Sequence, residues 1–242
     1  FSDGPRDYLV MDYVPGKDLR ERMLEVRRDK TFLSENEVIR WAVQIADALN
    51  YLHHQEPSII HRDIKPSNLK ITPSGVIKLV DFGLVKILAP NEVTITIIQG
   101  QGTALYTPLE QYGGDDTHTE ARADIFSFAA TLYHLLTNEP PAEARKRFLD
   151  TRSLTRPREI NPRISSHVER AILWAMSLHP DERPNNVIEF RDALLGKHEI
   201  PERADLNQTS FDIPNFSIFP EEQIAGYTVL GLFLLGLITT LL

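Results

Sequence analysis

Asp63, Asn68 and Asp81 are side chains that can hold a metal ion and accept a proton, and they lie in one short stretch, residues 60–83. The stretch reads IHRDIKPSNLKITPSGVIKLVDFG, with Lys65 two residues beyond the first aspartate. Between Asn68 and Asp81, β-branched residues flank a TPSG turn, which predicts a β-hairpin. We expect this hairpin to bring the two aspartates and the asparagine around one small volume.

The stretch resembles the signature of the protein-kinase family, H-R-D-x-K-x-x-N followed by D-F-G. Eight specified residues match by chance on the order of 10⁻¹⁰ times per starting position. The resemblance implies phosphoryl transfer from ATP, which needs positioning and charge neutralisation rather than covalent help. By the same resemblance, Asp63 orients the substrate hydroxyl and accepts its proton, and Asn68 and Asp81 hold Mg²⁺. Lys65 would contact the γ-phosphate, and lysine at this spacing is typical of serine/threonine kinases.

YLVMDYVPG, residues 8–16, reads as a buried strand that ends at a Pro-Gly turn. It resembles the last strand and hinge of the kinase N-lobe, which implies that Met11 is the gatekeeper. The backbone of Asp12 and Val14 would then bind adenine. Lys70 stands where most kinases have an apolar residue beneath adenine, although its aliphatic stem could supply that floor. An ordinary edge strand is the alternative for residues 8–16.

Residues 84–110 resemble the kinase activation segment, and they include Thr94 and Thr96. In the family, an arginine at the position of Arg62 often pairs with a phosphothreonine in this segment, which implies a phosphorylation switch. The alternative is that both threonines are only β-branched residues of a strand-like stretch.

Further contacts are implied by the same resemblance. Thr103 would bridge Asp63 and Lys65, and Glu110 of TPLE would pair with Arg183 of HPDERP to fix the C-lobe.

Helices are predicted to dominate from Leu19 to Leu195. We expect a polar helix over Lys17–Arg28 with Leu19, Met23 and Leu24 as its apolar stripe, a helix after a capping box at Ser34–Glu37 containing Val38, Trp41, Ile45, Leu49 and Leu52, a buried helix over Ala123–Thr137, a helix after a capping box at Ser166–Glu169, and a last helix from Asn186 to Gly196.

The histidine of the signature, the two histidines before it and Asp124 are expected to be structural. The resemblance makes His61 a packing residue beneath Phe82 rather than a general base, and it makes Asp124 an anchor for the catalytic-loop backbone. His53 and His54 close a predicted helix, where a solvated or capping role is expected.

Composition limits the partners. The net charge of −8 argues against nucleic acid as the main partner, and the absence of cysteine excludes a disulfide framework. The chain begins at Phe1 and contains neither a G-x-G-x-x-G-x-V loop nor a V-A-I-K strand, which the family places before the hinge. We therefore expect an N-terminally truncated chain with weak or no kinase activity of its own.

The C-terminal segment, QIAGYTVLGLFLLGLITTLL, carries no charge over residues 223–242. About 20 helical residues span roughly 30 Å, the thickness of a membrane's hydrocarbon core. This predicts a transmembrane helix after a proline-containing juxtamembrane linker. The one predicted helix implies a single-pass protein of the cell membrane, and the need for ATP implies that its kinase domain lies in the cytoplasm.

Together these features predict an α+β, protein-kinase-like fold, mainly the helical C-lobe, followed by a single transmembrane helix. The predicted parts are the end of the N-lobe and hinge (1–16), the C-lobe (17–196), the linker (197–222) and the membrane helix (223–242). The predicted function is ATP- and Mg²⁺-dependent phosphorylation of Ser/Thr hydroxyls of proteins by a bacterial-type kinase in membrane-linked signalling. Alternatives are a pseudokinase that binds partners through the C-lobe and a kinase-like enzyme for small molecules. A homodimer is compatible with the sequence, but nothing in it indicates one.

Overall fold

The computed structural model describes residues 2–3, 6–7, 12–81, 86–87, 101–112 and 120–201, with side chains described over 12–81, 103–112 and 120–201. The predictions for Met11, Phe82, Thr94 and Thr96 lie outside these ranges, as do those for residues 202–242. Within the ranges just given, no helix combines the length and apolar character needed to cross a membrane.

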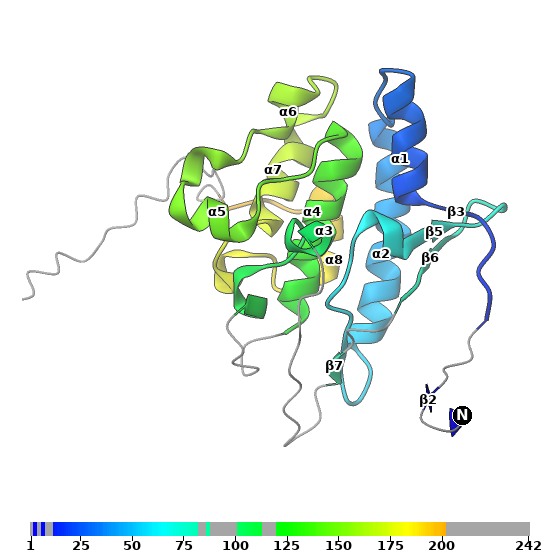
Figure 1. The fold of residues 1–242 in the computed structure, drawn as a ribbon. Coiled ribbons are helices and arrows are strands. Elements are labelled where there is room, and N and C mark those ends of the chain that lie inside the picture. The colour runs from blue at the N-terminus through cyan, green and yellow to red at the C-terminus, as the bar shows by residue number, and fades with distance from the viewer. Residues whose placement is uncertain are drawn as a thin grey trace, which may run out of the picture. The chain divides into compact units, whose positions relative to one another are not determined.

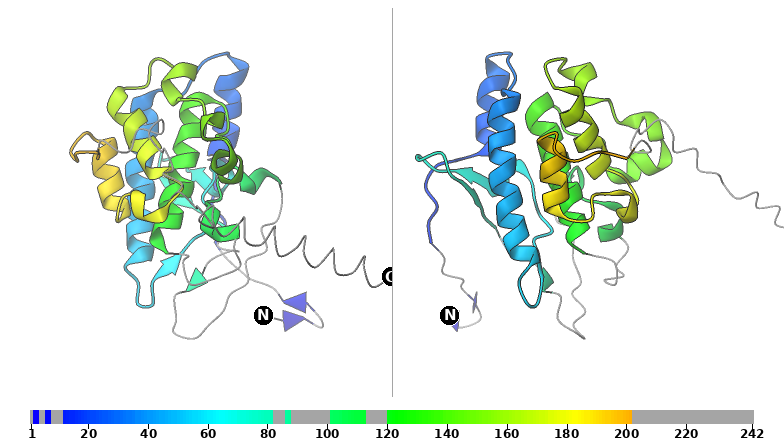
Figure 2. Two further views of the ribbon diagram at one scale, coloured as in Figure 1. Left: turned by 90° about the vertical axis from the view of Figure 1, so that its left-hand side faces the viewer. Right: turned by 180° about the vertical axis from the view of Figure 1, so that it is seen from behind.

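Helices make up most of the described chain. They are α1 (Leu19–Arg28), α2 (Glu35–His53), α3 (Gln101–Ala104), α4 (Ala121–Thr137), α5 (Ala144–Leu149), α6 (Pro157–Ile160), α7 (Ser166–Ala175) and α8 (Val187–Leu194), with short 3₁₀ helices η1 (Pro66–Asn68), η2 (Leu109–Tyr112), η4 (Thr151–Ser153) and η5 (Pro180–Glu182). The helix α4 packs against α2, α7 and α8, and α8 also contacts both α2 and α7 (Figure 1). Seen from behind, α8 lies between α2 and α7 (Figure 2).

The core is organised around α4. Its residues from Ala123 to Leu136 are buried on every side apart from the half-buried His134. An all-round apolar helix must be enclosed by other elements, so the prediction of a central buried helix is confirmed.

Short strands complete the fold. They are β1 (Ser2–Asp3), β2 (Arg6–Asp7), β3 (Lys17–Asp18), β4 (Ile59–Ile60), β5 (Leu69–Ile71), β6 (Ile77–Leu79) and β7 (Lys86–Ile87), all paired antiparallel. The predicted hairpin is confirmed as β5–β6, with Leu69 opposite Leu79, and β3 adds to it in the order β3-β5-β6. Figure 1 shows this small sheet beside α2.

The start of α1 differs from the prediction. Lys17 and Asp18 form β3, and the helix begins at Leu19, two residues later than predicted, because Asp18 caps it. The Asp18 carboxylate accepts a hydrogen bond from the Glu21 N–H (2.8 Å), and the Glu21 carboxylate accepts one from the Asp18 N–H (3.1 Å). Leu24 is exposed, so the apolar stripe of α1 is formed by Leu19 and Met23.

The predicted capping box at Ser166 is wrong. Ser165 is the residue before α7 and makes no side-chain cap. The Glu169 carboxylate, which is buried, instead accepts hydrogen bonds from the Arg158 N–H (2.9 Å) and from Arg156 (3.3 Å). A buried carboxylate requires such donors, and they come from a neighbouring segment rather than from its own helix.

Of the predicted capping box at Ser34–Glu37, the serine half is shown: the Ser34 hydroxyl accepts from the Glu37 N–H (3.2 Å) at the start of α2. At the start of α8, Asn186 is a cap that was not predicted, since its side chain accepts from the Glu189 N–H (2.9 Å).

The segment before β3 is not a strand in its described part. Residues 12–15 have no regular structure, and Tyr13 is 83% exposed. The chain then turns at Gly16, whose φ of +114° favours glycine.

We expect Gly16→Ala to destabilise the protein much more than Gly75→Ala. A Cβ at Gly16 would lie 2.0 Å from the Ile71 carbonyl oxygen, whereas one at Gly75, whose φ is +82°, would meet nothing within 4 Å. The positive φ alone costs roughly 1–2 kcal/mol, so Gly75→Ala is the matched control, and the backbone clash should add about 2 kcal/mol at Gly16. Urea unfolding measures both, and equal losses of stability would show that the backbone around Ile71 yields without cost.

Candidate active site

Asp63 is held in place by one of its two carboxylate oxygens. Its Oδ2 accepts hydrogen bonds from Lys65 Nζ (2.8 Å) and Asn68 Nδ2 (2.9 Å). Its Oδ1 accepts none from any residue that the structure describes. The residue is buried at 7% exposure. Asp63 therefore offers one oxygen, already oriented, to an incoming hydroxyl group.

Lys65 lies between Asp63 and Thr103. Besides its bond to Asp63, its Nζ donates to Thr103 Oγ1 (3.1 Å). The prediction placed Thr103 in the middle of this trio, whereas the structure places the ammonium there. Thr103 is itself buried, and its carbonyl accepts from Thr107 Oγ1 (2.9 Å), which ties the TPLE segment to the catalytic loop.

Asn68 and Asp81 are brought together by the hairpin. Val80 N–H donates to the Asn68 carbonyl (2.9 Å), so Asp81 follows directly after the residue paired with Asn68. Asp81 is exposed and has a φ of +65°, a backbone conformation that is uncommon for aspartate.

These two residues suit a magnesium ion. The Asn68 amide nitrogen is committed to the Asp63 carbonyl (2.8 Å) and carboxylate (2.9 Å), which directs the amide oxygen elsewhere. Mg²⁺ is commonly bound by one or two protein oxygens, with phosphates and water completing its octahedron. Among the described side chains, no group of three or more His, Cys, Asp or Glu residues could hold a metal ion. An ion bound by Asn68 and Asp81 would thus take its other ligands from the nucleotide and water.

Asp124 of α4 anchors the catalytic loop, as predicted. Its Oδ1 accepts from the Arg62 N–H (2.8 Å) and its Oδ2 from the His61 N–H (2.9 Å). The carboxylate also bonds His53 Nε2 (2.9 Å), and both side chains are buried. His53 was expected to be solvated or to cap its own helix, so that prediction is wrong. Its neighbour His54 does bond its own helix, through the Asn50 carbonyl (2.8 Å).

His61 is completely buried, as a packing residue should be. Burial lowers the pKa of its imidazole, and the nearby carboxylates of Asp124 and Asp63 only partly oppose this. A neutral, enclosed imidazole fits a structural role.

Arg62 is also buried and has a φ of +68°. Its proposed phosphothreonine partners, Thr94 and Thr96, lie outside the described residues, so its regulatory role stays a prediction.

The predicted ion pair between Glu110 and Arg183 is present and bidentate. Arg183 Nη1 lies 2.6 Å from Glu110 Oε1, and Nη2 lies 3.0 Å from Oε2. The guanidinium, fully buried, also donates to the carbonyls of Ser177 (2.8 Å), Leu178 (2.9 Å) and Arg122 (3.1 Å). Arg183 therefore joins the segment after Thr107 to the loop before α8.

Lys70 makes a contact that sequence reasoning missed. Its Nζ donates to the Val14 carbonyl (3.1 Å) and lies 5.5 Å from the centre of the Tyr13 ring. Asp12, which lies two residues before Val14, is exposed to solvent. In the position predicted for the adenine floor, the structure thus has an ammonium bound to the hinge backbone.

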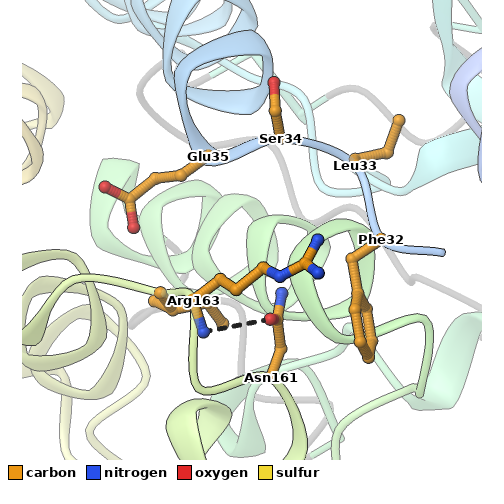
Figure 3. Close-up of a pocket in the computed structure, with 7 residues that line it drawn as sticks. Phe32, Leu33, Ser34, Glu35, Asn161 and Arg163 are labelled. Carbon is orange, nitrogen blue, oxygen red and sulfur yellow. Dashed lines mark hydrogen bonds between the residues drawn. The ribbon is translucent and has the colours of Figure 1, made fainter.

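Two cavities are described. One, of about 360 Å³, adjoins the catalytic loop and includes Lys65 and Thr103 in its lining. The other, of about 190 Å³, lies where the segment before α2 meets the segment before α7, with Phe32 facing Asn161 and Arg163 (Figure 3). None of the predicted site residues lines this second cavity.

Comparison with known proteins agrees with this geometry. The model of the protein kinase domain matches residues 1–199. A protein described as a "probable serine/threonine-protein kinase" of Clostridium acetobutylicum is 36% identical over 201 residues, which are 80% of this chain and 29% of the relative. The serine/threonine-protein kinase PknB of Mycobacterium tuberculosis is 33% identical over 201 residues, which are 81% of this chain and 31% of that protein. The chain thus spans less than a third of the length of these relatives.

A solved structure named PpkA-294 apo form matches with a TM-score of 0.58 at 22% identity, covering 75% of this chain and 61% of that one. At this identity the likeness concerns the fold alone.

Proposed function

Because this chain belongs to the protein kinase family, we propose that it carries the catalytic loop of a bacterial-type serine/threonine kinase. The proposed reaction is transfer of the γ-phosphoryl group of ATP to serine and threonine hydroxyls of proteins. The observation that carries the proposal is the hydrogen-bonded group of Asp63, Lys65 and Asn68, with Thr103 on the far side of the lysine.

Each residue of this group has a distinct task. The open Oδ1 of Asp63 accepts a hydrogen bond from the substrate hydroxyl, orients its oxygen toward the phosphorus, and takes its proton during transfer. Lys65 places a positive charge beside that hydroxyl, where the transferred phosphoryl group carries negative charge. Thr103 and Asp63 together keep the lysine in that place.

Asn68 and Asp81 are the residues that would hold Mg²⁺. When bound, the ion would neutralise charge on the nucleotide phosphates. The protein's contribution would be to bring Asn68 and Asp81 to the same end of the β5–β6 hairpin, where the Val80 N–H bonds the Asn68 carbonyl.

The glycine-rich loop and strand lysine of the family are not in this chain, so activity is to be assayed on the full-length protein, including any coding sequence before Phe1. The assay is transfer of labelled phosphate from ATP and Mg²⁺ to a serine- or threonine-containing protein. A full-length protein that binds partners but transfers no phosphate would support the pseudokinase alternative instead.

We also propose that phosphorylation at Thr94 or Thr96 is a regulatory switch in which the phosphate pairs with Arg62.

We further propose that residues 223–242 form a single membrane-spanning anchor, with the kinase domain in the cytoplasm. The support for the anchor is the uncharged composition of this segment and its length of about 20 residues, which suits the hydrocarbon core. Resistance of the full-length protein to extraction from membranes at alkaline pH is its test.

Lys70→Met is expected to tighten ATP binding by the full-length protein about 2- to 10-fold. The lysine donates a hydrogen bond to the Val14 carbonyl, in the segment predicted to hold adenine. If this bond has to break when the nucleotide enters, binding loses its net contribution of about 0.5–1.5 kcal/mol. Methionine supplies an apolar floor and leaves the hinge carbonyl open. Calorimetric titration with ATP measures the change.

Lys78→Met is the matched control, because Lys78 lies opposite Lys70 on the neighbouring strand and is exposed. Weaker binding in Lys70→Met would mean that the ammonium contacts the nucleotide favourably.

A further inference from the structure

The cavity of about 360 Å³ lies between the first turn of α1 and the catalytic loop. Its polar lining includes Arg20 from α1, Lys65 from the catalytic loop, Thr103, and Tyr106 with His134 of α4. Since Lys65 also touches Asp63, the cavity adjoins the place where the substrate hydroxyl is proposed to bind. None of the residues that line it is an aspartate or glutamate.

The carboxylates of Asp18, Glu21 and Glu25, in α1 and its cap, already form hydrogen bonds or ion pairs with groups outside the cavity. Asp18 and Glu21 bond each other's backbone N–H groups as the helix cap. Glu25 forms ion pairs with Lys17 and Arg22. These carboxylates are therefore not available to neutralise the remaining cations of the helix.

Arg20 of α1 lines the cavity, and Arg27 of the same helix acts on it only through its charge at His134. Both are exposed, and neither forms an ion pair with a residue in the described part of the chain. Their effect is visible at His134, where burial and then the charges of Arg27 and Arg20 lower the pKa of the imidazole to about 4. His134 is thus neutral at pH 7, and its Nδ1 shares a hydrogen bond with the Tyr106 hydroxyl (2.7 Å).

We propose that this cavity binds a carboxylate side chain of the protein substrate close to the phosphorylated residue, and that Arg20 determines this specificity. The lining contains no acid, Lys65 is already paired with Asp63, and the histidine is neutral, so Arg20 adds a positive charge that no described carboxylate pairs with, which favours an anionic occupant. The inference rests on the proposed function, because the occupant is a substrate of that reaction.

The test uses peptides that differ only at one position near a serine, where they carry Glu, Gln or Lys. With the full-length protein, the Glu peptide is expected to have a KM about 5- to 10-fold lower than the Gln peptide, with similar kcat. Arg20→Gln should remove this preference, and Arg20→Glu should make the Lys peptide the better substrate. Arg28→Gln is the matched control, since Arg28 is exposed at the other end of α1 and does not line the cavity.

Peptide binding without nucleotide, followed by fluorescence anisotropy, separates this inference from the proposed function. A Glu preference that depends on Arg20 in binding, with no phosphate transfer by any variant, would reject the kinase activity but retain the carboxylate site. Equal binding of the Glu and Gln peptides to the unaltered protein, or a preference that persists in Arg20→Gln, would overturn the assignment of Arg20.

Discussion

Asp63→Asn in the full-length protein is expected to lower the rate of phosphate transfer by about 10²- to 10⁴-fold. Asparagine keeps the size of the side chain, and its single oxygen can still accept from Lys65 and Asn68, which bond one carboxylate oxygen in the native protein. What is lost is the negative charge and the oxygen that takes the hydroxyl proton. The measurement is single-turnover transfer of phosphate from ATP to a serine-containing substrate.

Asp47→Asn serves as its control, because Asp47 is an exposed carboxylate that pairs with Arg191 on the surface. That change should leave the rate within about twofold. Thermal unfolding of both variants shows whether the fold is intact. A folded Asp63→Asn protein that retains the unaltered rate would reject the mechanism proposed for this carboxylate.

Arg183→Met is expected to cost about 3–5 kcal/mol of stability, the range for removing one partner of a buried ion pair. The variant leaves the Glu110 carboxylate, whose side chain is 9% exposed, without its bidentate partner. It also leaves three carbonyl groups without their donor, those of Ser177, Leu178 and Arg122. Urea unfolding followed by circular dichroism measures the free energy of unfolding.

Arg191→Met is the matched control. Arg191 also pairs with two carboxylates, Asp47 and Asp192, but its side chain is 26% exposed. Surface pairs contribute about 0–1 kcal/mol, so the loss should be small. Similar losses in the two variants would mean that burial is not what makes the Arg183 pair important.

The sequence predicted most of the regular structure. The helices α2, α4 and α8 and the β5–β6 hairpin follow from local periodicity, caps and turn residues, which a short stretch of chain contains in full. The contacts of Asp124 with the loop backbone and of Glu110 with Arg183 were expected from the family resemblance, since residues more than 60 positions apart share no local pattern.

Other contacts were predicted neither from a local pattern nor from the resemblance. His53 and Asp124 are 71 residues apart, and a histidine at a helix end usually faces solvent. Glu169 lies three residues after Ser166, which is the spacing of a capping box, but its carboxylate is buried and accepts a hydrogen bond from the Arg158 N–H of α6 instead. Lys70 reaches Val14 across 56 residues, and only the pairing of β3 with β5 places them near each other.

The single carboxylate of Asp124 has a consequence for the motions of the catalytic loop. It holds two loop amides and the last residue of α2 from within the most buried helix of the protein. A surface loop normally opens by itself, with little free energy, while helices in the core open only with the whole domain. Here the His61 and Arg62 amides cannot reach solvent unless α4 gives up its bonds to them. We therefore expect these two amides to exchange as slowly as the core helices, although the loop has no regular structure.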